Sequence, residues 1–238
     1  MVEITNLTKL FGDNKVLDID HLTIPEGDFV GLVGNNGAGK TTLFRLMFDL
    51  LKRDSGTVLI DGADVTASED WKARCGVYLD NSFLIDYLGP EEFFYFIGKT
   101  YGMTKDEVDA RLETFHQFMN GEILGTKKFI RDMSMGNKQK IGIVAAMLHS
   151  PRLLVLDEPF NFLDPSSQIR IKEILHAYNA ATGATVIISS HNLNHTIDVC
   201  TRILLLEKGY IIKDIPAQDA GSRRQLEEYF DITDKTYE

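Results

Sequence analysis

At residues 34–42 the chain reads Gly34-Asn35-Asn36-Gly37-Ala38-Gly39-Lys40-Thr41-Thr42, which fits the pattern G-x-x-x-x-G-K-[ST]. The apolar run before it, 29–33, is typical of a strand, and the segment after it has helical apolar spacing. This order of strand, glycine-rich loop and helix is the context in which the pattern binds phosphate. We therefore expect a phosphate-binding loop within an α/β fold.

Each residue type of this loop suits a bound phosphate chain. Gly34, Gly37 and Gly39 let the backbone curve around an anion with its N–H groups pointing inward, and the helix that follows adds its positive end. Lys40 supplies a mobile positive charge for the β- and γ-phosphates. Thr41 offers a hydroxyl oxygen to Mg²⁺. The alternative is a glycine-rich turn that binds nothing, which Lys40 and both flanking elements disfavour.

A second, acidic motif follows the apolar run 153–156, which predicts a buried strand. Asp157 and Glu158 come directly after this run, and ligands of parallel α/β sheets bind at the carboxyl ends of the strands. We expect Asp157 to hold Mg²⁺ through a water, and Glu158 to orient or deprotonate the attacking water. The alternative is a solvated acidic turn after a core strand.

Strand-like runs alternate with helical patterns over most of the chain, which predicts a parallel sheet buried on both faces. The predicted strands are 2–10, 16–24, 29–33, 57–60, 76–79, 153–156, 185–189, 203–206 and 210–215. The predicted helices are 39–51, 91–101, 105–119, 137–148, 166–181, 192–200 and 219–230, followed by an acidic tail at 231–238. Residues 82–150 contain no convincing strand, so we expect a mainly helical lobe there.

The composition is that of an ordinary soluble globular protein. The 238 residues include 25 Lys and Arg against 35 Asp and Glu, a formal net charge of −10. This charge disfavours nucleic acid as the main partner, because phosphate binding needs a surplus of basic residues on one face. Cys75 and Cys200 lack metal-ligand spacing and predict buried free thiols in a reducing compartment. Without a recognisable signal peptide or spanning segment, we expect a soluble, cytoplasmic protein.

Further motifs resemble those of the ATP-binding cassette ATPases, the nucleotide-binding subunits of ABC transporters. Met133-Ser134-Met135-Gly136-Asn137 resembles the family signature, usually Leu-Ser-Gly-Gly-Gln. Asn161-Phe162-Leu163-Asp164 resembles the loop that crosses the dimer interface, and Ser189-Ser190-His191 resembles the switch histidine. Phe11 matches the aromatic residue that stacks on adenine, and Val16 matches the apolar residue below it.

The resemblance covers about residues 2–215 and implies an α/β fold. It implies a P-loop NTPase (RecA-like) core with an N-terminal antiparallel β-subdomain and an inserted α-helical subdomain. It also implies an ABC ATPase domain at 1–215, with the helical subdomain at about 82–150. A C-terminal helix and acidic tail would then occupy 216–238.

The activity implied by the resemblance is hydrolysis of ATP, with Mg²⁺, between two paired cassettes that meet head to tail. The catalytic residues implied are Lys40, Glu158 and His191, and the metal ligands implied are Thr41, Asp157 and Asp80. The nucleotide contacts implied are Phe11, Val16, Gly34, Asn35, Asn36, Gly37, Ala38, Gly39, Lys40, Thr41, Thr42, Ser134, Gly136 and Asn137. The partner implied is a separate membrane permease, of exporter type, with the chain held peripherally on the cytoplasmic face of the cell membrane.

Two positions depart from the family pattern. Met135 stands where the signature usually has its first glycine, but Ser134 and Gly136 are retained, so we expect closure on the γ-phosphate to survive. Asp80 and Asn81 stand where the family commonly has a glutamine that contacts Mg²⁺ and senses the membrane partner. An oxygen of Asp80 can still serve the metal.

The predicted helix 91–101 is rich in aromatic residues. A core stripe accounts for Phe93, Phe96, Ile97 and Tyr101. We therefore expect Phe94 and Tyr95 to be exposed, and an exposed aromatic surface marks a contact site. Since the family receives a short permease helix in this region, the hypothesis is that residues 82–98 dock the permease. The alternative is plain core packing.

Two other functions are alternatives to that of a transporter subunit. One is a soluble ABC ATPase acting on ribosomes or DNA, but such members usually carry two modules or a long coiled-coil insertion. The other is a nucleotide-dependent regulator with little turnover. Glu158 and His191 argue against that regulator, whereas Met135 and Asp80 leave room for it.

Overall fold

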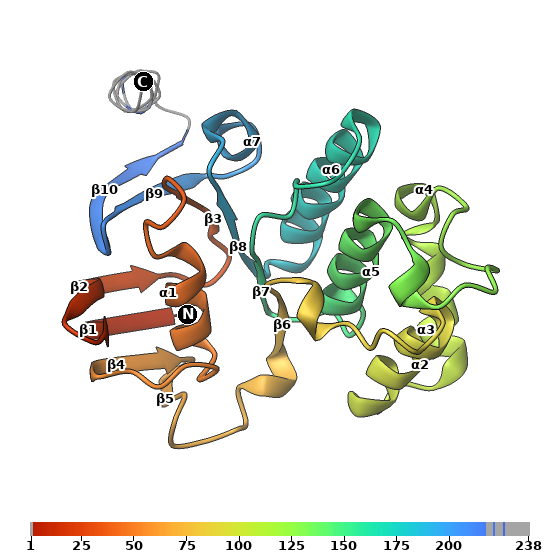
Figure 1. The fold of residues 1–238 in the computed structure, drawn as a ribbon, viewed down its shortest axis with the longest axis horizontal. Coiled ribbons are helices and arrows are strands. Elements are labelled where there is room, and N and C mark those ends of the chain that lie inside the picture. Colours follow the sequence, from red (N-terminus) through yellow and green to blue (C-terminus); the bar gives the residue numbers. More distant parts are fainter. Residues whose placement is uncertain (1, 218–220, 222–225, 227–238) are drawn as a thin grey trace. The chain divides into compact units, whose positions relative to one another are not determined.

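The structure, a computed structural model, describes residues 2–217 together with Gly221 and Leu226 (Figure 1). The chain divides into two compact units. The first unit combines Met1–Ser68 with Thr185–Glu238, and the second is Glu69–Ala184. The predicted helix 219–230 and the acidic tail 231–238 lie outside the described residues, except for Gly221 and Leu226. The division of the chain at residue 215 stays a prediction.

An antiparallel sheet begins the first unit. Its strands have the order β2 (Asn14–Ile24), β1 (Val2–Phe11), β4 (Ser55–Ile60) and β5 (Ala63–Asp64). Alternate residues of β1 are buried, with Val2 opposite Ile24 and Ile4 opposite Leu22. This alternation gives the sheet one apolar face. It is the antiparallel β-subdomain that the resemblance implied.

A mixed sheet forms the rest of the first unit. Its strands have the order β10 (Tyr210–Pro216), β9 (Arg202–Glu207), β3 (Phe29–Val33) and β8 (Thr185–Ser190). β3 is parallel to β8 and β9, and every residue of β3 and β8 is buried, as strands covered on both faces require. Helix α1 (Lys40–Met47) follows β3, and α7 (Leu193–Ile197) follows β8.

Two short parallel strands begin the fold of the second unit. β6 (Cys75–Tyr78) and β7 (Leu153–Leu156) pair with Tyr78 opposite Leu156. The helices are α2 (Pro90–Thr100), α3 (Lys105–Glu113), α4 (His116–Met119), α5 (Met135–Met147) and α6 (Pro165–Thr182). Short 3₁₀ turns are η1 (Lys72–Arg74), η2 (Asn81–Phe83) and η3 (Ile130–Asp132). No strand interrupts residues 90–147, all of which are described, and the α/β class with a helical insertion is confirmed.

The predicted helix 105–119 is two helices. At the end of α3 the Thr114 hydroxyl donates to the backbone oxygen of Arg111 at 2.7 Å, and Phe115 takes a non-helical conformation before α4 begins. Phe115 is buried at this break. A threonine that bonds back to its own helix competes with continuation of that helix.

The buried stripe of α2 differs from the prediction. Phe94 is fully buried and Phe96 is 49% exposed, so the expectations of an exposed Phe94 and of a Phe96 in the core stripe were both wrong. The stripe is Pro90, Phe93, Phe94 and Gly98. A Cβ at Gly98 would overlap the side chain of Val108, so α3 packs closely against α2 at this glycine. Gly98 belongs to the buried face of α2 but adds no apolar side chain to the sequence pattern. The pattern of apolar residues therefore predicted a different face.

Candidate nucleotide site

The phosphate loop lies between β3 and α1, as predicted, and its backbone needs its glycines. Gly37 and Gly39 have φ values of +83° and +111°, which L side chains rarely adopt. Gly34 is required for a different reason, because a Cβ there would overlap the backbone oxygen of Leu206. Helix α1 begins at Lys40, so its positive end lies at the loop.

Lys40 lies inside the curve of this loop. Its residue is 7% exposed, and its Nζ donates to the backbone oxygen of Gly34 at 2.6 Å and to that of Asn35 at 3.4 Å. The ammonium is therefore held by the loop it serves. A phosphate oxygen is a stronger acceptor than a carbonyl oxygen, so a bound phosphate chain would draw this charge toward itself.

The predicted adenine contacts lie on the β1–β2 hairpin. Phe11 is 53% exposed at the end of β1, where it pairs with Asn14 across the turn. The backbone oxygen of Val16 lies close to Gly39, since a Cβ on that glycine would approach it to 3.1 Å. The structure thus brings Val16 to the phosphate loop and leaves the ring of Phe11 exposed at the tip of the same hairpin.

His191 leaves the sheet beside the phosphate loop. Ser190 pairs with Val33 in the parallel register of β8 and β3, and the backbone N of Gly34 donates to the oxygen of Ser190 at 3.3 Å. The residues that follow these partners, His191 and the loop, therefore share one edge of the sheet. His191 is exposed there. The Ser190 hydroxyl accepts from the backbone N of Asn192 at 2.9 Å and so fixes the turn that carries the histidine.

The acidic residues of the second unit also gather at the carboxyl edge of a strand pair. Asp80 follows β6 by two residues and Asp157 follows β7 directly, and the two strands end in register. Asp157 is 5% exposed, and its backbone N donates to the oxygen of Tyr78 at 2.8 Å. The Asp80 carboxylate accepts from the backbone N of Ser82 at 2.8 Å and from the Ser82 hydroxyl, which caps η2.

The donor set fits Mg²⁺, which prefers oxygen ligands and usually keeps waters and phosphate oxygens in its shell. The described residues contain no cluster of three or more His, Cys, Asp or Glu that could hold a metal by itself. The sequence candidates Thr41, Asp157 and Asp80 all offer oxygen. Each of these side chains, taken within its own unit, is a donor of the kind that Mg²⁺ binds.

The signature segment starts a helix. Ser134 is the N-cap of α5, and its hydroxyl accepts from the backbone N of Asn137 at 3.2 Å. Ser134 and Met135 are exposed, so the positive end of α5 faces outward within this unit. A Cβ at Gly136 would lie 2.7 Å from the backbone oxygen of Phe162, which explains a glycine there. Phe162 itself is 64% exposed.

A family model described as ABC transporter matches residues 17–161. The chain belongs to the ABC transporter family. It is 35% identical over 220 residues to the uncharacterized ABC transporter ATP-binding protein YhaQ of Bacillus subtilis, covering 88% of this chain and 69% of that one. It is 31% identical over 236 residues to the bacitracin transport ATP-binding protein BcrA of Enterococcus faecalis, covering 98% and 75%.

A solved structure of the ATP-binding cassette MJ0796, dimeric and bound to ADP and Pi in a post-hydrolysis state, has the same fold. It matches with a TM-score of 0.81 at 24% identity, covering 92% of this chain and 100% of that one. The predicted P-loop NTPase core, with its β-subdomain and helical insertion, is thus confirmed.

Family membership makes the chain the ATP-binding, ATP-hydrolysing subunit of an ABC transporter, a class that works with membrane permease components. Within residues 2–217, every helix is too short or too polar to cross a bilayer.

Sequence reasoning missed two residues beside Glu158. The Gln139 side chain donates to the backbone oxygen of Glu158, and the Tyr78 hydroxyl contacts Gln139 in turn. One signal was present in the sequence: a glutamine at the start of a buried helical run needs hydrogen-bond partners. Nothing in the sequence says which partners these are.

Proposed function

We propose that this cassette powers an exporter as one of two copies that clasp ATP head to tail. The observation that carries the proposal is the glycine-dependent loop that encloses the buried Lys40 at the start of α1. The relative from Enterococcus faecalis supports a role in transport, since its name assigns it to bacitracin transport. The dimeric MJ0796 cassette supports the pairing. The chain would then lie on the cytoplasmic face of the cell membrane, with the cassette spanning 1–215.

Within this proposal the first unit binds the nucleotide. The ring of Phe11 stacks on adenine above Val16, and the backbone of residues 34–42 with Lys40 holds the phosphates. His191 donates to the γ-phosphate from the sheet edge that it shares with the loop. Thr41, Asp157 and Asp80 would supply oxygens to Mg²⁺, which would offset the negative charge of the phosphates. Glu158 accepts a proton from the attacking water.

The exposed N-terminus of α5 completes the site of the second copy. The positive end of this helix and the Ser134 hydroxyl suit an anion, and Gly136 and Asn137 lie in the same first turn. The exposed Phe162 lies next to this turn and supports an interface there. Each copy would thus close the phosphate loop of the other.

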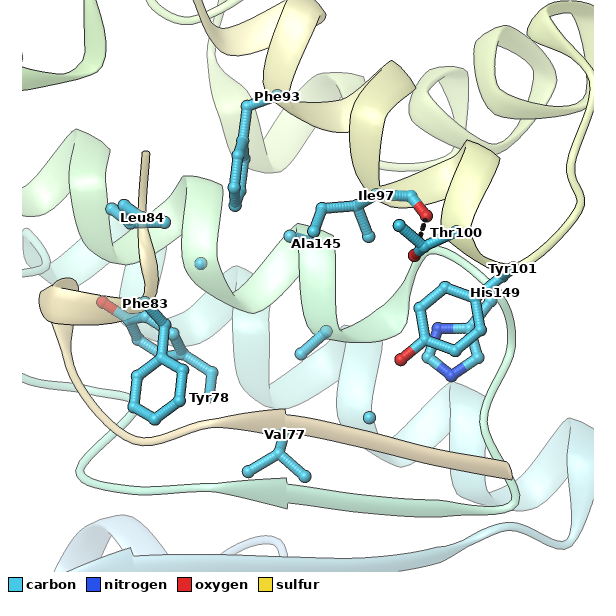
Figure 2. A pocket seen from close by; sticks show the side chains of 13 residues that line it. Val77, Tyr78, Phe83, Leu84, Phe93, Ile97, Thr100, Tyr101, Ala145 and His149 are labelled. Carbon is cyan, nitrogen blue, oxygen red and sulfur yellow. Dashed lines mark hydrogen bonds between the residues drawn. The ribbon is translucent and has the colours of Figure 1, made fainter. Parts of the chain in front are cut away.

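The permease is proposed to dock on a cavity of about 180 Å³ in the second unit. Figure 2 shows Phe83, Leu84, Phe93 and Ile97 around it, all from residues 82–98, with the stacked Tyr101 and His149 at one end. Phe83 is 45% exposed and apolar, which suits a contact surface. The occupant proposed is an apolar side chain from a cytoplasmic helix of the permease.

The test of the proposed function is steady-state MgATP hydrolysis by Glu158→Gln. Removing a positioned base costs about 10²–10⁴-fold in rate, so we expect kcat to fall by that factor while ATP binding persists. Hydrolysis of MgATP at the parental rate by this variant would contradict the role of Glu158 as the base. Glu113→Gln is the matched control, because Glu113 is an exposed glutamate at the end of α3.

A further inference from the structure

Gln139 is a buried amide in the second unit. It is 4% exposed and begins the stretch of α5, 139–147, that is buried throughout. Its Nε2 donates to the backbone oxygen of Glu158 at 3.1 Å, and its Oε1 lies 3.1 Å from the Tyr78 hydroxyl. A backbone carbonyl oxygen can only accept a hydrogen bond, so the amide nitrogen of Gln139 must be the atom that faces Glu158. Both ends of the side chain are therefore committed.

The backbone that Gln139 holds is in an uncommon conformation. Glu158 has a φ of +48°, in the left-handed region that residues other than glycine rarely occupy. Such a conformation persists only where its surroundings fix it. Two donors do so at the Glu158 carbonyl, namely Gln139 Nε2 and the backbone N of Asn161 at 3.2 Å. The direction of the Glu158 side chain follows from this backbone.

Tyr78 holds the other end of the amide. Its ring lies against α5 at Gly142, where a Cβ would overlap the ring. Its hydroxyl lies 2.6 Å from Asn81 Oδ1 as well as 3.1 Å from Gln139 Oε1. The Tyr78 phenol is the donor in both contacts. Its single hydrogen is shared between two acceptor oxygens.

We propose that Gln139 is a positioning residue for ATP hydrolysis, which holds the backbone of Glu158 so that its carboxylate meets the attacking water. Tyr78 fixes the amide of Gln139 and ties it to Asn81. This inference rests on the proposed role of Glu158. Phe83 belongs to η2, the same turn as Asn81, and it lines the cavity proposed for the permease. The hydrogen bonds of Tyr78 and Gln139 therefore also connect the lining of this cavity to the backbone of Glu158.

The test compares kcat and KM for MgATP in Gln139→Met, Tyr78→Phe and the double variant. Methionine keeps the length of the side chain but has no N–H, and a misplaced reacting group can cost up to about 10²-fold. We expect kcat of Gln139→Met to fall 10- to 100-fold with KM changed less than about twofold. Tyr78→Phe keeps the ring, so we expect a smaller fall. The double variant should match Gln139→Met, because both changes break one chain of bonds.

Asn179→Leu is the matched control. The Asn179 Nδ2 also donates to a backbone oxygen, that of Ala184 at 2.8 Å, but from the end of α6. Parental kcat in Gln139→Met, or losses that multiply in the double variant, would overturn the proposal. Thermal unfolding checks that each variant folds, and if Gln139→Met does not, parental kcat in folded Tyr78→Phe overturns it. Parental kcat in Glu158→Gln would instead refute the proposed function.

Discussion

Lys40 shows how one residue can be ready for a ligand before the ligand binds. A buried ammonium is costly unless polar groups surround it, and here the backbone oxygens of Gly34 and Asn35 do so. Those oxygens belong to the loop that would hold the phosphates. On binding, the ammonium would exchange its hydrogen bonds to these oxygens for bonds to the phosphate chain.

We expect Lys40→Ala to weaken ATP binding about 10- to 100-fold. Hydrogen bonds to charged groups contribute about 1.5–3 kcal/mol, and the variant loses the only lysine of the loop 34–42. Isothermal titration calorimetry with MgATP measures the change. Lys72→Ala is the control, because Lys72 is an exposed lysine paired with Glu69 at 2.7 Å. Equal affinities for Lys40→Ala and the parent would contradict the assigned role.

His149 gives the protein a pH-dependent stability. Burial, followed by the nearby Arg111 charge, lowers the pKa of His149 to about 4, against an opposing hydrogen bond from its Nε2 to the Cys75 oxygen at 3.1 Å. The unfolded chain takes up a proton near pH 6.5, whereas the folded chain does so only near pH 4. The contribution of the neutral His149 to the free energy of unfolding is therefore fully present above pH 6.5, and it is lost as the pH falls toward 4.

From pH 7 to pH 5 we expect this histidine to cost up to about 2 kcal/mol of unfolding free energy, as an upper bound for a half-buried ring. His149→Phe keeps a ring to stack on Tyr101 and removes the titration. Its urea-unfolding free energy should fall less over this range than that of the parent. His176→Phe, at an exposed position of α6, should keep the parental pH dependence. An unchanged dependence in His149→Phe would refute the assignment.

At the scale of single residues, the sequence was informative where chemistry and spacing coincide. The loop 34–42 and the Asp157–Glu158 pair lie at strand ends, as their motifs required. Gln139 was not predicted from the sequence, because its role depends on Tyr78 and Glu158, which are distant along the chain. A side chain whose partners are set by tertiary packing gives no local pattern to read.

Among the elements, α2 shows the limit of periodicity. Its existence and length were predicted closely, as 91–101 against Pro90–Thr100. Its buried face was not, because Gly98 provides the closest contact to α3 without an apolar side chain. The break between α3 and α4 was missed for a related reason. A threonine back-bond and one buried phenylalanine end a helix with no glycine or proline to mark the position.

The cavity beside α2 gives a prediction for the permease contact. We expect Phe83→Ser to keep basal MgATP hydrolysis, because an exposed side chain contributes little to the fold. Its retention on membranes that carry the permease should fall severalfold. Phe96→Ser is the matched control, since Phe96 is 49% exposed on α2 but does not line the cavity. Equal retention of both variants and the parent would refute docking at this site.

In the molecule as a whole, the motifs are divided between the two units. The phosphate loop, Phe11 and His191 belong to the first unit, and the acidic strand end and the signature belong to the second. In the pairing proposed here, Ser134 of one copy closes on the phosphates held by Lys40 of the other. ATP would then be part of the interface between copies, and its hydrolysis would release them.

Sedimentation velocity of Glu158→Gln with and without MgATP tests this pairing. A ligand that binds only the paired state shifts the equilibrium toward pairs. The variant hydrolyses ATP slowly, so the pairs persist during the measurement. We predict a monomer without nucleotide and a species of twice the mass with MgATP. A variant that binds MgATP by calorimetry yet sediments as a monomer at the same protein concentration would contradict the account.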